Sequence, residues 1–203
     1  MILVRSGRRR GALGTALVLG ALGAFAAPIR PANAQLASEP ATVSQTVAGT
    51  EVTVAYSRPR VHGRRGLFGT TVRWGELWTP GANQATTLRT TRDVTIEGTA
   101  VPKGRYSVWL TPSTGPTWEL LLDGDTTRFH TQRPRPHAGQ IRFAVRHETR
   151  PFTEALTWSF PDVRADGTTL VLQWDTVSVP LRVAVTPGDR RTLAPDTMLL
   201  RKR

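Results

Sequence analysis

The chain has 203 residues, no cysteine, and 27 basic against 15 acidic side chains, which gives a formal net charge of +12. The absence of cysteine excludes disulfide bonds, thiolate chemistry and a lipid attached to an N-terminal cysteine. The fold must therefore be stabilised by its hydrophobic core, and a domain of about 150 residues buries roughly 68 to 70% of its unfolded surface.

Residues 1–34 have the pattern of a cleaved signal peptide. Arginines cluster among the first ten residues, and an uncharged run rich in Ala, Leu and Gly follows over residues 11–27. A charged region followed by an apolar one is typical of secretory signals. Ala32-Asn33-Ala34 places small residues one and three positions before a cleavage site, so we predict cleavage after Ala34. The apolar run is shorter than the roughly 20 residues of a membrane-spanning helix, so we expect no stable membrane insertion after cleavage.

Export changes how the positive charge is interpreted. Residues 1–34 hold five of the arginines and no acidic residue, which leaves 22 basic and 15 acidic side chains in the mature chain. A basic surface binds nucleic acid only where that polyanion is present, so we expect no nucleic-acid partner. The choices between the periplasm and the cell exterior, and between the ordinary secretory and twin-arginine routes, stay open.

The mature chain begins with a polar lead over residues 35–40 and continues with a predicted β-hairpin. Residues 42–47 and 51–57 alternate in polarity around Ala48-Gly49-Thr50, as paired strands do. Residues 58–85 show no sustained alternation and are punctuated by glycine and proline, which predicts a long connection. Connections of more than about 12 to 15 residues are uncommon in compact domains and are often functional.

Alternation resumes after this connection and predicts a chain made almost entirely of strands. We predict strands over residues 86–91, 94–97, 105–111, 117–122, 141–148, 154–160, 168–174 and 177–185. Pro180 cannot donate to a strand ladder, so it predicts an edge strand or a bulge there.

With no helical stripe, the pattern predicts one antiparallel two-sheet β-sandwich over residues 41–186, with a closed or partly open β-barrel as the alternative. Residues 187–203 are predicted to be a basic flexible tail.

Several short motifs occur in order along the chain. They are Tyr56-Ser57-Arg58-Pro59, Gly63-Arg64, Phe68-Gly69, Gly75 with Trp78, Gly81-Ala82-Asn83, and Pro102 with Gly104 and Tyr106-Ser107. This set resembles the bacterial family called domain of unknown function 2911, and the resemblance implies an exported β-rich domain of unassigned activity. Two positions depart from the family pattern, because Thr79 stands where Arg is common and Gln84 where Glu is common. A structural ion pair replaced by neutral hydrogen-bonding residues is a simpler account than the loss of a working acid and base.

The strongest candidate binding site lies within the long connection. Trp74, Trp78, Asn83, Gln84 and Thr86 combine aromatic faces with amide and hydroxyl groups. Such a mixture suits a sugar or peptide ligand, because a ring stacks on the aromatic face while the amides fix its orientation. The competing interpretation is structural: Trp78 closes the end of the sandwich, and Asn83 ties a turn through its side-chain amide.

No motif indicates a catalytic centre, a metal site or a cofactor. The chain lacks a nucleophile elbow, a phosphate-binding glycine loop and a zinc-protease motif. Histidines stand at positions 62, 130, 137 and 147. His130 and His137 share one predicted loop and, with Asp123 or Asp125, would be near enough to share an ion, yet their spacing does not require one. Five aromatic residues are interpreted as core or sheet-face side chains, namely Tyr106, Trp109, Trp118, Trp158 and Trp174.

These observations favour a non-catalytic binding or interaction module of the cell envelope, with a small molecule, glycan or peptide as its ligand. The alternatives are a hydrolase-like enzyme with its site in the 58–86 connection and a purely structural envelope domain. A deep cleft with converging polar groups in that connection favours the enzyme, a shallow aromatic shelf favours the binder, and a packed loop favours the structural role.

Overall fold

The computed structural model describes residues 38–186, and this part of the chain contains ten β-strands and no helix. Consequently, within these residues, no helix is long and apolar enough to cross a membrane. The predicted signal peptide (1–34), residues 35–37 of the predicted lead and the predicted tail (187–203) lie outside the described residues.

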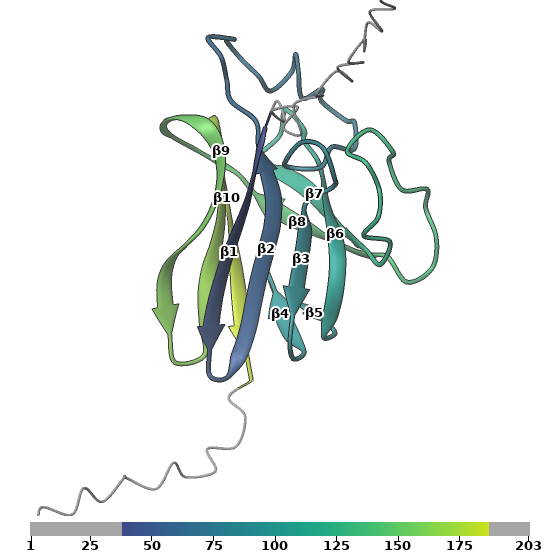
Figure 1. Cartoon of the computed structure of the whole chain (residues 1–203), viewed down its shortest axis with the longest axis vertical. Coiled ribbons are helices and arrows are strands. Elements are labelled where there is room, and N and C mark those ends of the chain that lie inside the picture. Colours follow the sequence, from purple (N-terminus) through teal and green to yellow (C-terminus); the bar gives the residue numbers. More distant parts are fainter. Residues whose placement is uncertain (1–37, 187–203) are drawn as a thin grey trace, which may run out of the picture. The chain divides into compact units, whose positions relative to one another are not determined.

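The larger sheet has six antiparallel strands in the order β1-β2-β3-β6-β7-β8 (Figure 1). Its strands are β1 (Glu39–Val47), β2 (Thr50–Arg58), β3 (Thr87–Thr90), β6 (Gly104–Thr111), β7 (Thr117–Asp123) and β8 (Ile141–Arg146). Glu39 and Pro40, which the sequence assigns to the polar lead, belong to β1 and pair with Arg58 and Ser57 of β2.

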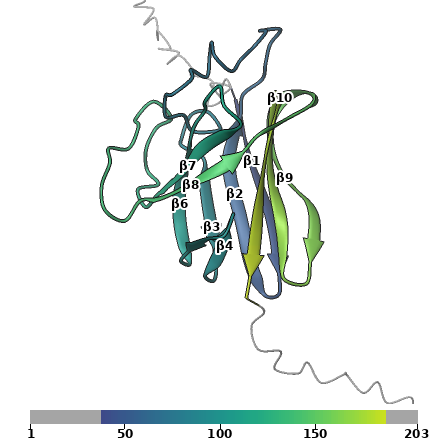
Figure 2. The same cartoon turned by 180° about the vertical axis from the view of Figure 1, so that it is seen from behind.

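The smaller sheet has the order β5-β4-β10-β9 and is also antiparallel. Its strands are β4 (Val94–Ile96), β5 (Thr99–Val101), β9 (Glu148–Arg164) and β10 (Gly167–Val185). The two ends of β10 lie side by side, because the backbone N–H of Val185 donates to the carbonyl of Asp166 at 2.8 Å. The long strand therefore doubles back near Asp175, where φ is +55°, as Figure 2 shows.

Two tight turns explain the short hairpins. Ala48 and Gly49 both have positive φ between β1 and β2, and so do Glu97 and Gly98 between β4 and β5. Consecutive residues with positive φ form the turn type that matches the twist of paired strands. The first hairpin agrees with the prediction, whereas β5 was not predicted, because three residues are too few to show alternation and Glu-Gly is a weak turn signal.

The core lies between the two sheets. On the larger sheet alternate residues face inward, among them Val52 and Val54 of β2 and Val108 and Leu110 of β6, and all four are buried. Leu156, Trp158, Leu170, Leu172, Trp174, Val179, Leu181, Val183 and Val185 cover them from the smaller sheet. The predicted β-sandwich is thus confirmed, and the sheets do not close into the alternative barrel.

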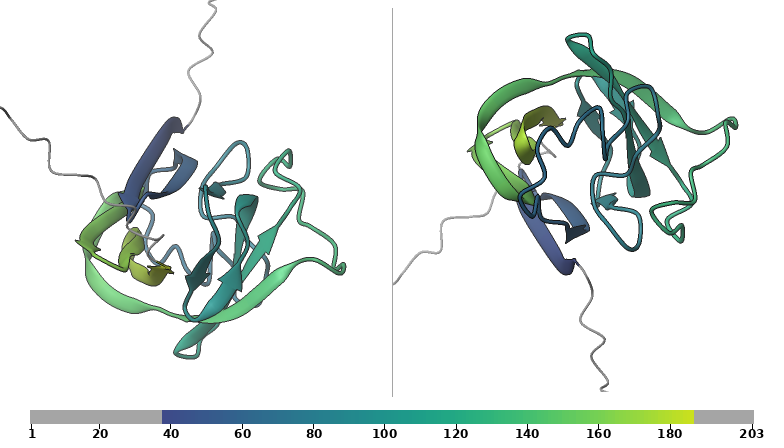
Figure 3. Two further views of the ribbon diagram at one scale, coloured as in Figure 1. Left: turned by 90° about the horizontal axis from the view of Figure 1, so that it is seen from below. Right: turned by 90° about the horizontal axis from the view of Figure 1, so that it is seen from above.

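The two sheets are joined at both sides. On one side only His147 separates β8 from β9, so the chain passes directly from one sheet to the other (Figure 3). On the other side the segment after β2 pairs with β9: Val61 N–H donates to the carbonyl of Glu154 at 2.8 Å, and Leu156 N–H donates to that of Pro59 at 2.9 Å.

Pro180 does not lie where the sequence predicts, because β10 is an interior strand and its register shifts lie elsewhere, between Thr169 and Val177. The pairing of β10 with β9 ends at Ser178, and its pairing with β4 begins at Val183. Pro180 therefore lies in the gap between two ladders, where its missing N–H costs no paired hydrogen bond.

Candidate functional site

Trp78 and Thr86 both pair with β6, and the chain between them leaves the ladder in a short excursion over residues 80–85. Before it, Trp78 and Leu110 exchange backbone hydrogen bonds of 2.8 and 2.7 Å; after it, Val108 N–H donates to the carbonyl of Thr86 at 2.8 Å. Both ends of the excursion are therefore held by the same strand. This arrangement holds residues 80–85 as a fixed wall rather than a free loop.

Two buried threonines close the base of this excursion. The hydroxyl of Thr79 donates to the carbonyl of Val108 at 2.9 Å and accepts the N–H of Thr86 at 3.0 Å. The hydroxyl of Thr86 donates to the carbonyl of Pro80 at 2.8 Å. Gln84 is exposed on the excursion itself, and within residues 38–186 no hydrogen bond joins it to Thr79. Thr79 therefore acts as a buried hydrogen-bonding residue, and it is not bonded to Gln84 in this part of the chain.

Asn83 ties the excursion to three other segments. Its φ is +60°, a left-handed conformation that asparagine tolerates better than most residues. Its side-chain amide donates to the carbonyl of Ser38 at 3.1 Å and to the hydroxyl of Ser57 at 3.2 Å. Its carbonyl accepts the backbone N–H of His130 at 2.8 Å. Asn83 therefore holds the excursion against β2 and against the connection over residues 124–140.

A hollow of about 330 Å³ lies beside this excursion. Its floor belongs to the outer face of the larger sheet: Ala55, Thr87 and Arg105 point outward there, because their neighbours Val54, Leu88 and Tyr106 pack against the core. The complete lining is Pro40, Ala55, Tyr56, Ser57, Asn83, Gln84, Ala85, Thr87, Arg105 and Thr126. Apolar surface with a few polar groups is the usual composition of a small-ligand site.

Two polar groups of the hollow have hydrogen-bonding capacity to spare. Arg105 is exposed, and its guanidinium makes a single long hydrogen bond, from Nη2 to the hydroxyl of Thr87 at 3.4 Å. Within residues 38–186 it has no acidic partner within salt-bridge distance. The hydroxyl of Ser57 accepts from Asn83 but donates to no acceptor in the same part of the chain. Both groups are available to a ligand.

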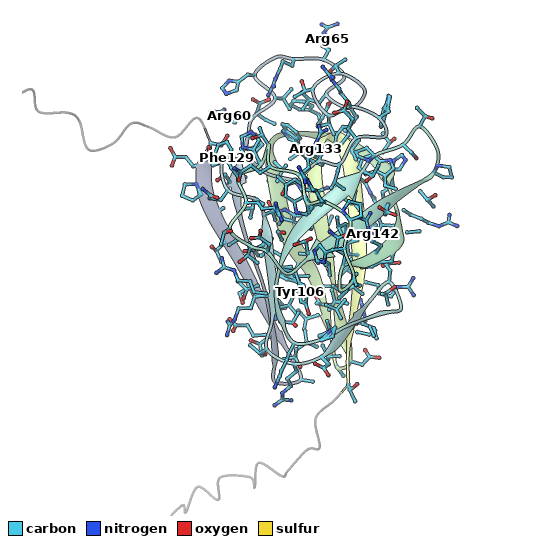
Figure 4. The ribbon with its side chains drawn as sticks, turned by 90° about the vertical axis from the view of Figure 1, so that its right-hand side faces the viewer. Arg60, Arg65, Tyr106, Phe129, Arg133 and Arg142 are labelled. Atoms are coloured by element: carbon cyan, nitrogen blue, oxygen red, sulfur yellow. The ribbon has the colours of Figure 1, made fainter. Side chains whose placement is uncertain are left out.

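An aromatic ring stands next to the hollow. Residues 83–85 pair with residues 128–130, since Ala85 N–H donates to the carbonyl of Arg128 at 2.9 Å and Gln84 forms an antiparallel bridge with Phe129. Directly opposed residues of such a pair have their side chains on the same face. Phe129 is 40% exposed and lies toward β1 and β2 in Figure 4. It is thus placed to stack on a ligand that contacts Gln84.

A buried carboxylate anchors the 124–140 connection. Asp123 has no exposed surface, and its carboxylate accepts from the Gln140 amide at 2.7 Å, the Asp125 N–H at 2.8 Å and His137 Nε2 at 2.9 Å. Burial alone raises the pKa of Asp123, but the hydrogen bonds from Gln140, Asp125 and His137 outweigh it and lower that pKa. The pKa of His137 is raised by its hydrogen bond to the Ala138 carbonyl and by its contact with Asp123.

Beneath these connections lies a second, smaller apolar cluster of Ala85, Trp109 and Leu121, with Leu77 against it. Trp109 is therefore buried as predicted, but on the outer face of the sheet. Its indole N–H donates to the hydroxyl of Ser107 at 3.0 Å, which itself donates to the Asp125 carbonyl at 2.7 Å. The excursion and the 124–140 connection are thus packed onto the sheet, which makes the hollow a shaped surface.

The five residues predicted from sequence as a binding site lie in three places. Asn83 and Gln84 line the hollow, and Thr86 is buried at the base of the excursion. Trp74 and Trp78 belong to an aromatic cluster centred on Phe68, whose ring centroid is 6.4 Å from that of Trp74 and 5.8 Å from that of Trp78. The cluster closes one end of the sandwich, with Trp78 stacked on Trp174 at 6.0 Å.

The histidines do not gather around a common point. Within residues 38–186 no three His, Asp or Glu side chains are arranged to hold a metal ion. His137 pairs with Asp123, whereas His130 lies beside Phe129 and faces the carbonyl of Asn83 at 3.0 Å. His147 stacks on Trp118 at 4.6 Å. Sequence reasoning overlooked Ser57, Arg105 and Phe129 as site residues, because only strand register brings them next to Asn83 and Gln84.

Comparison with known proteins assigns the chain to a family without assigning an activity. Neither a search of curated proteins nor a search of solved structures found a match. The model of a family described as "protein of unknown function (DUF2911)" matches residues 38–183, which cover all ten strands except the last two residues of β10. The chain therefore belongs to the DUF2911 family of proteins of unknown function.

Proposed function

We propose that this protein is an exported, non-catalytic binding module that takes a small ligand, a glycan fragment or a peptide end, in the hollow beside residues 80–85. The observation that carries the proposal is the hollow itself, with an apolar floor, an unpaired guanidinium at Arg105 and a spare hydroxyl donor at Ser57. Phe129 adds an exposed ring at its side. A shallow shelf of this kind suits binding.

Among residues 38–186, the one histidine in contact with a carboxylate, His137, anchors the 124–140 connection. His137 directs both ring nitrogens at acceptors, the Ala138 carbonyl at 2.6 Å and the Asp123 carboxylate at 2.9 Å. The hydroxyl of Ser107 donates to backbone carbonyls. A nucleophile needs a base within hydrogen-bond reach, and neither Ser57 nor Ser107 has one among the described residues. These contacts favour a binding module over a hydrolase.

The 59–86 connection divides into two parts with different roles. Its first part packs on the core through Val61, Leu67 and Val72, all of them buried, and so contributes to stability. Its last part, residues 80–85, forms the wall of the hollow. The division supports a ligand site on a rigid support, because precise sites are built on backbone that packing and hydrogen bonds hold in place.

Filling the hollow tests the proposal. Ala55→Phe places a ring on its floor, whereas Thr53→Phe places the same ring on the same strand and face but outside the lining. A thermal-shift screen against glycans and peptides would identify ligands; at one hundred times its Kd a ligand adds about 2.7 kcal/mol of stability. We expect the wild type and Thr53→Phe to respond and Ala55→Phe not to respond. An undiminished response of Ala55→Phe would place the ligand elsewhere.

The export part of the proposal rests on residues 1–34 and has its own test. We expect material recovered from outside the cytoplasm to begin at Gln35, because the small residues of Ala32-Asn33-Ala34 precede that position. N-terminal sequencing measures this directly. A chain that still begins at Met1 and fractionates with membranes would contradict it.

A further inference from the structure

We infer that the ligand of the hollow carries a carboxylate and that Arg105 binds it. The inference rests on the proposed function and names the chemistry that the same hollow selects. Of the ten lining residues, Arg105 is the only one with a formal charge. A site lined by one cation and no anion favours a ligand with a single negative charge.

The guanidinium of Arg105 is left without compensation by its neighbours. Directly across the sheet it faces Arg89, another cation, whose own acidic partner is Glu51 at 3.5 Å. Asp125, next to the lining residue Thr126, is already paired with Arg128 at 3.1 Å. An anion placed in the hollow therefore meets a guanidinium that no acidic side chain among residues 38–186 neutralises.

The geometry of the guanidinium and the single positive charge of the lining together favour a carboxylate. A guanidinium presents parallel N–H donors that match the two oxygens of a carboxylate, and the bonds are strengthened by both charges. Arg105 uses one donor, weakly, on Thr87. A phosphate group has nearly two charges at neutral pH and would need further cations, which the lining does not contain.

The remaining polar groups suit the body of a small acid. Ser57 has a hydroxyl proton to donate, and Gln84 and Thr126 add polar side chains to the lining. Pro40 and Ala55 add apolar surface. In a volume of about 330 Å³ this set accommodates a C-terminal amino-acid residue or a sugar acid, which share the carboxylate.

A second hollow of the molecule differs from the first because its charged side chains are paired with one another or with neighbours. It has about 550 Å³ on the outer face of β9 and β10 and includes Glu148, Arg150 and Asp162. There Arg150 bonds Glu148 at 2.8 Å, and Asp162 bonds Arg164 and the N–H of Thr169. Its cation and its carboxylates are already satisfied, so this larger hollow does not select an anion as the smaller one does.

The test uses matched pairs of acids and neutral isosteres on the mature chain at low salt, where charge interactions are least screened. N-acetylalanine and N-acetylalaninamide probe a peptide end, and glucuronate and glucuronamide probe a sugar acid. Binding is followed by NMR shifts of the backbone amides of Ser57, Gln84 and Thr126. The variants are Arg105→Gln, Arg105→Lys and, as a control of equal charge change, Arg146→Gln on β8.

We expect one acid to bind at least about tenfold more tightly than its amide, since charge-assisted hydrogen bonds are roughly twice as strong as neutral ones. Arg105→Gln should lose that preference, Arg105→Lys should retain part of it, and Arg146→Gln should keep all of it. The acid that binds identifies the source of the carboxylate. Equal binding of acid and amide at the hollow would overturn the inference while leaving the proposed function intact. If neither member of either pair shifts these amides, the inference also fails, and the thermal-shift screen decides the proposed function separately.

Discussion

Trp78 and Asn83 are five residues apart in the sequence but serve different surfaces of the molecule. Trp78 is half-buried and stacks on Trp174 within the cluster that closes the sandwich. Asn83 is bonded to Ser38 and Ser57 and holds the wall of the hollow. The side chain of Trp78 therefore acts through packing, and that of Asn83 acts through hydrogen bonds at the edge of the proposed ligand site.

Replacing each residue by alanine should separate these roles. Trp78→Ala should lower the free energy of unfolding by about 3 kcal/mol, the lower end for a buried aromatic, because Trp78 is only half-buried. Asn83→Ala should cost about 1 kcal/mol for the lost side-chain hydrogen bonds, with up to a further 1–2 kcal/mol for the positive φ. Urea denaturation measures both. Asn83→Gly is the matched control, since it removes the same bonds without the backbone strain.

The same variants also report on ligand binding. Trp78→Ala should leave the affinity of any ligand from the screen unchanged, because Trp78 does not line the hollow. Asn83→Gly should weaken it, because the wall loses its ties to β2. A Trp78→Ala variant of normal stability that had lost binding would instead make the aromatic cluster the ligand site.

At the scale of an element, the 124–140 connection depends on one titratable anchor. Asp123 and His137 are joined at 2.9 Å, with the pKa of the acid lowered by hydrogen bonds that outweigh its burial and that of the histidine raised by its bond to the Ala138 carbonyl. Because the pKa of Asp123 is lowered, its ionised carboxylate stabilises the fold at any pH above the usual pKa of 3.8. That stabilisation is lost as the pH falls through the lowered pKa. Because the pKa of His137 is raised, its protonated ring stabilises the fold at any pH below the usual pKa of 6.5. That stabilisation is lost as the pH rises through the raised pKa.

The connection should therefore be held most firmly between pH 3.8 and pH 6.5 and should loosen on both sides of that range. Hydrogen exchange at the N–H groups of Ala85 and His130, which join the connection to the excursion, measures this after correction for intrinsic rates. His137→Gln should abolish the alkaline change, whereas His62→Gln, on the other long connection, should preserve it. Unchanged protection above pH 6.5 in the wild type would contradict the anchor.

Which elements the sequence predicts depends on what stabilises each one. Long strands with inward-facing rows, such as β2, β6 and β7, have clear alternation and were predicted nearly to their ends. The three-residue β5 exists because β4 offers it a partner, and the excursion exists because β6 pairs with the chain on both sides of it. Both causes are contacts with a partner strand, which the local sequence does not contain. Alternation therefore predicts the long strands but not β5 or the excursion.

At the scale of the whole molecule, the same distinction separates the fold from the site. The sandwich follows from apolar periodicity, which is a property of each segment alone. The hollow requires Ala55, Thr87 and Arg105 to share the outer face of three adjacent strands, where Ala55 opposes Thr87 and Arg105 stands two residues before Ser107, the partner of Thr87 on β6. A shift of one residue would turn Arg105 inward. Sequence reasoning therefore found Asn83 and Gln84, which lie in or beside a recognisable motif, but not Arg105, which lines the same hollow from another strand.

The two sheets of the domain differ in how far apart in the sequence their paired residues lie. All strands of the larger sheet end by Arg146, and its paired residues lie at most 38 positions apart, between Val52 and Thr90. By contrast, β4 contributes Val94–Ile96 but pairs with Val183–Val185, at the very end of β10. Contacts between such distant residues slow folding, because closing the long loop between them costs conformational entropy before the contacts form. The β4–β5 hairpin therefore gains its neighbour in the smaller sheet only when the final residues of β10 are in place.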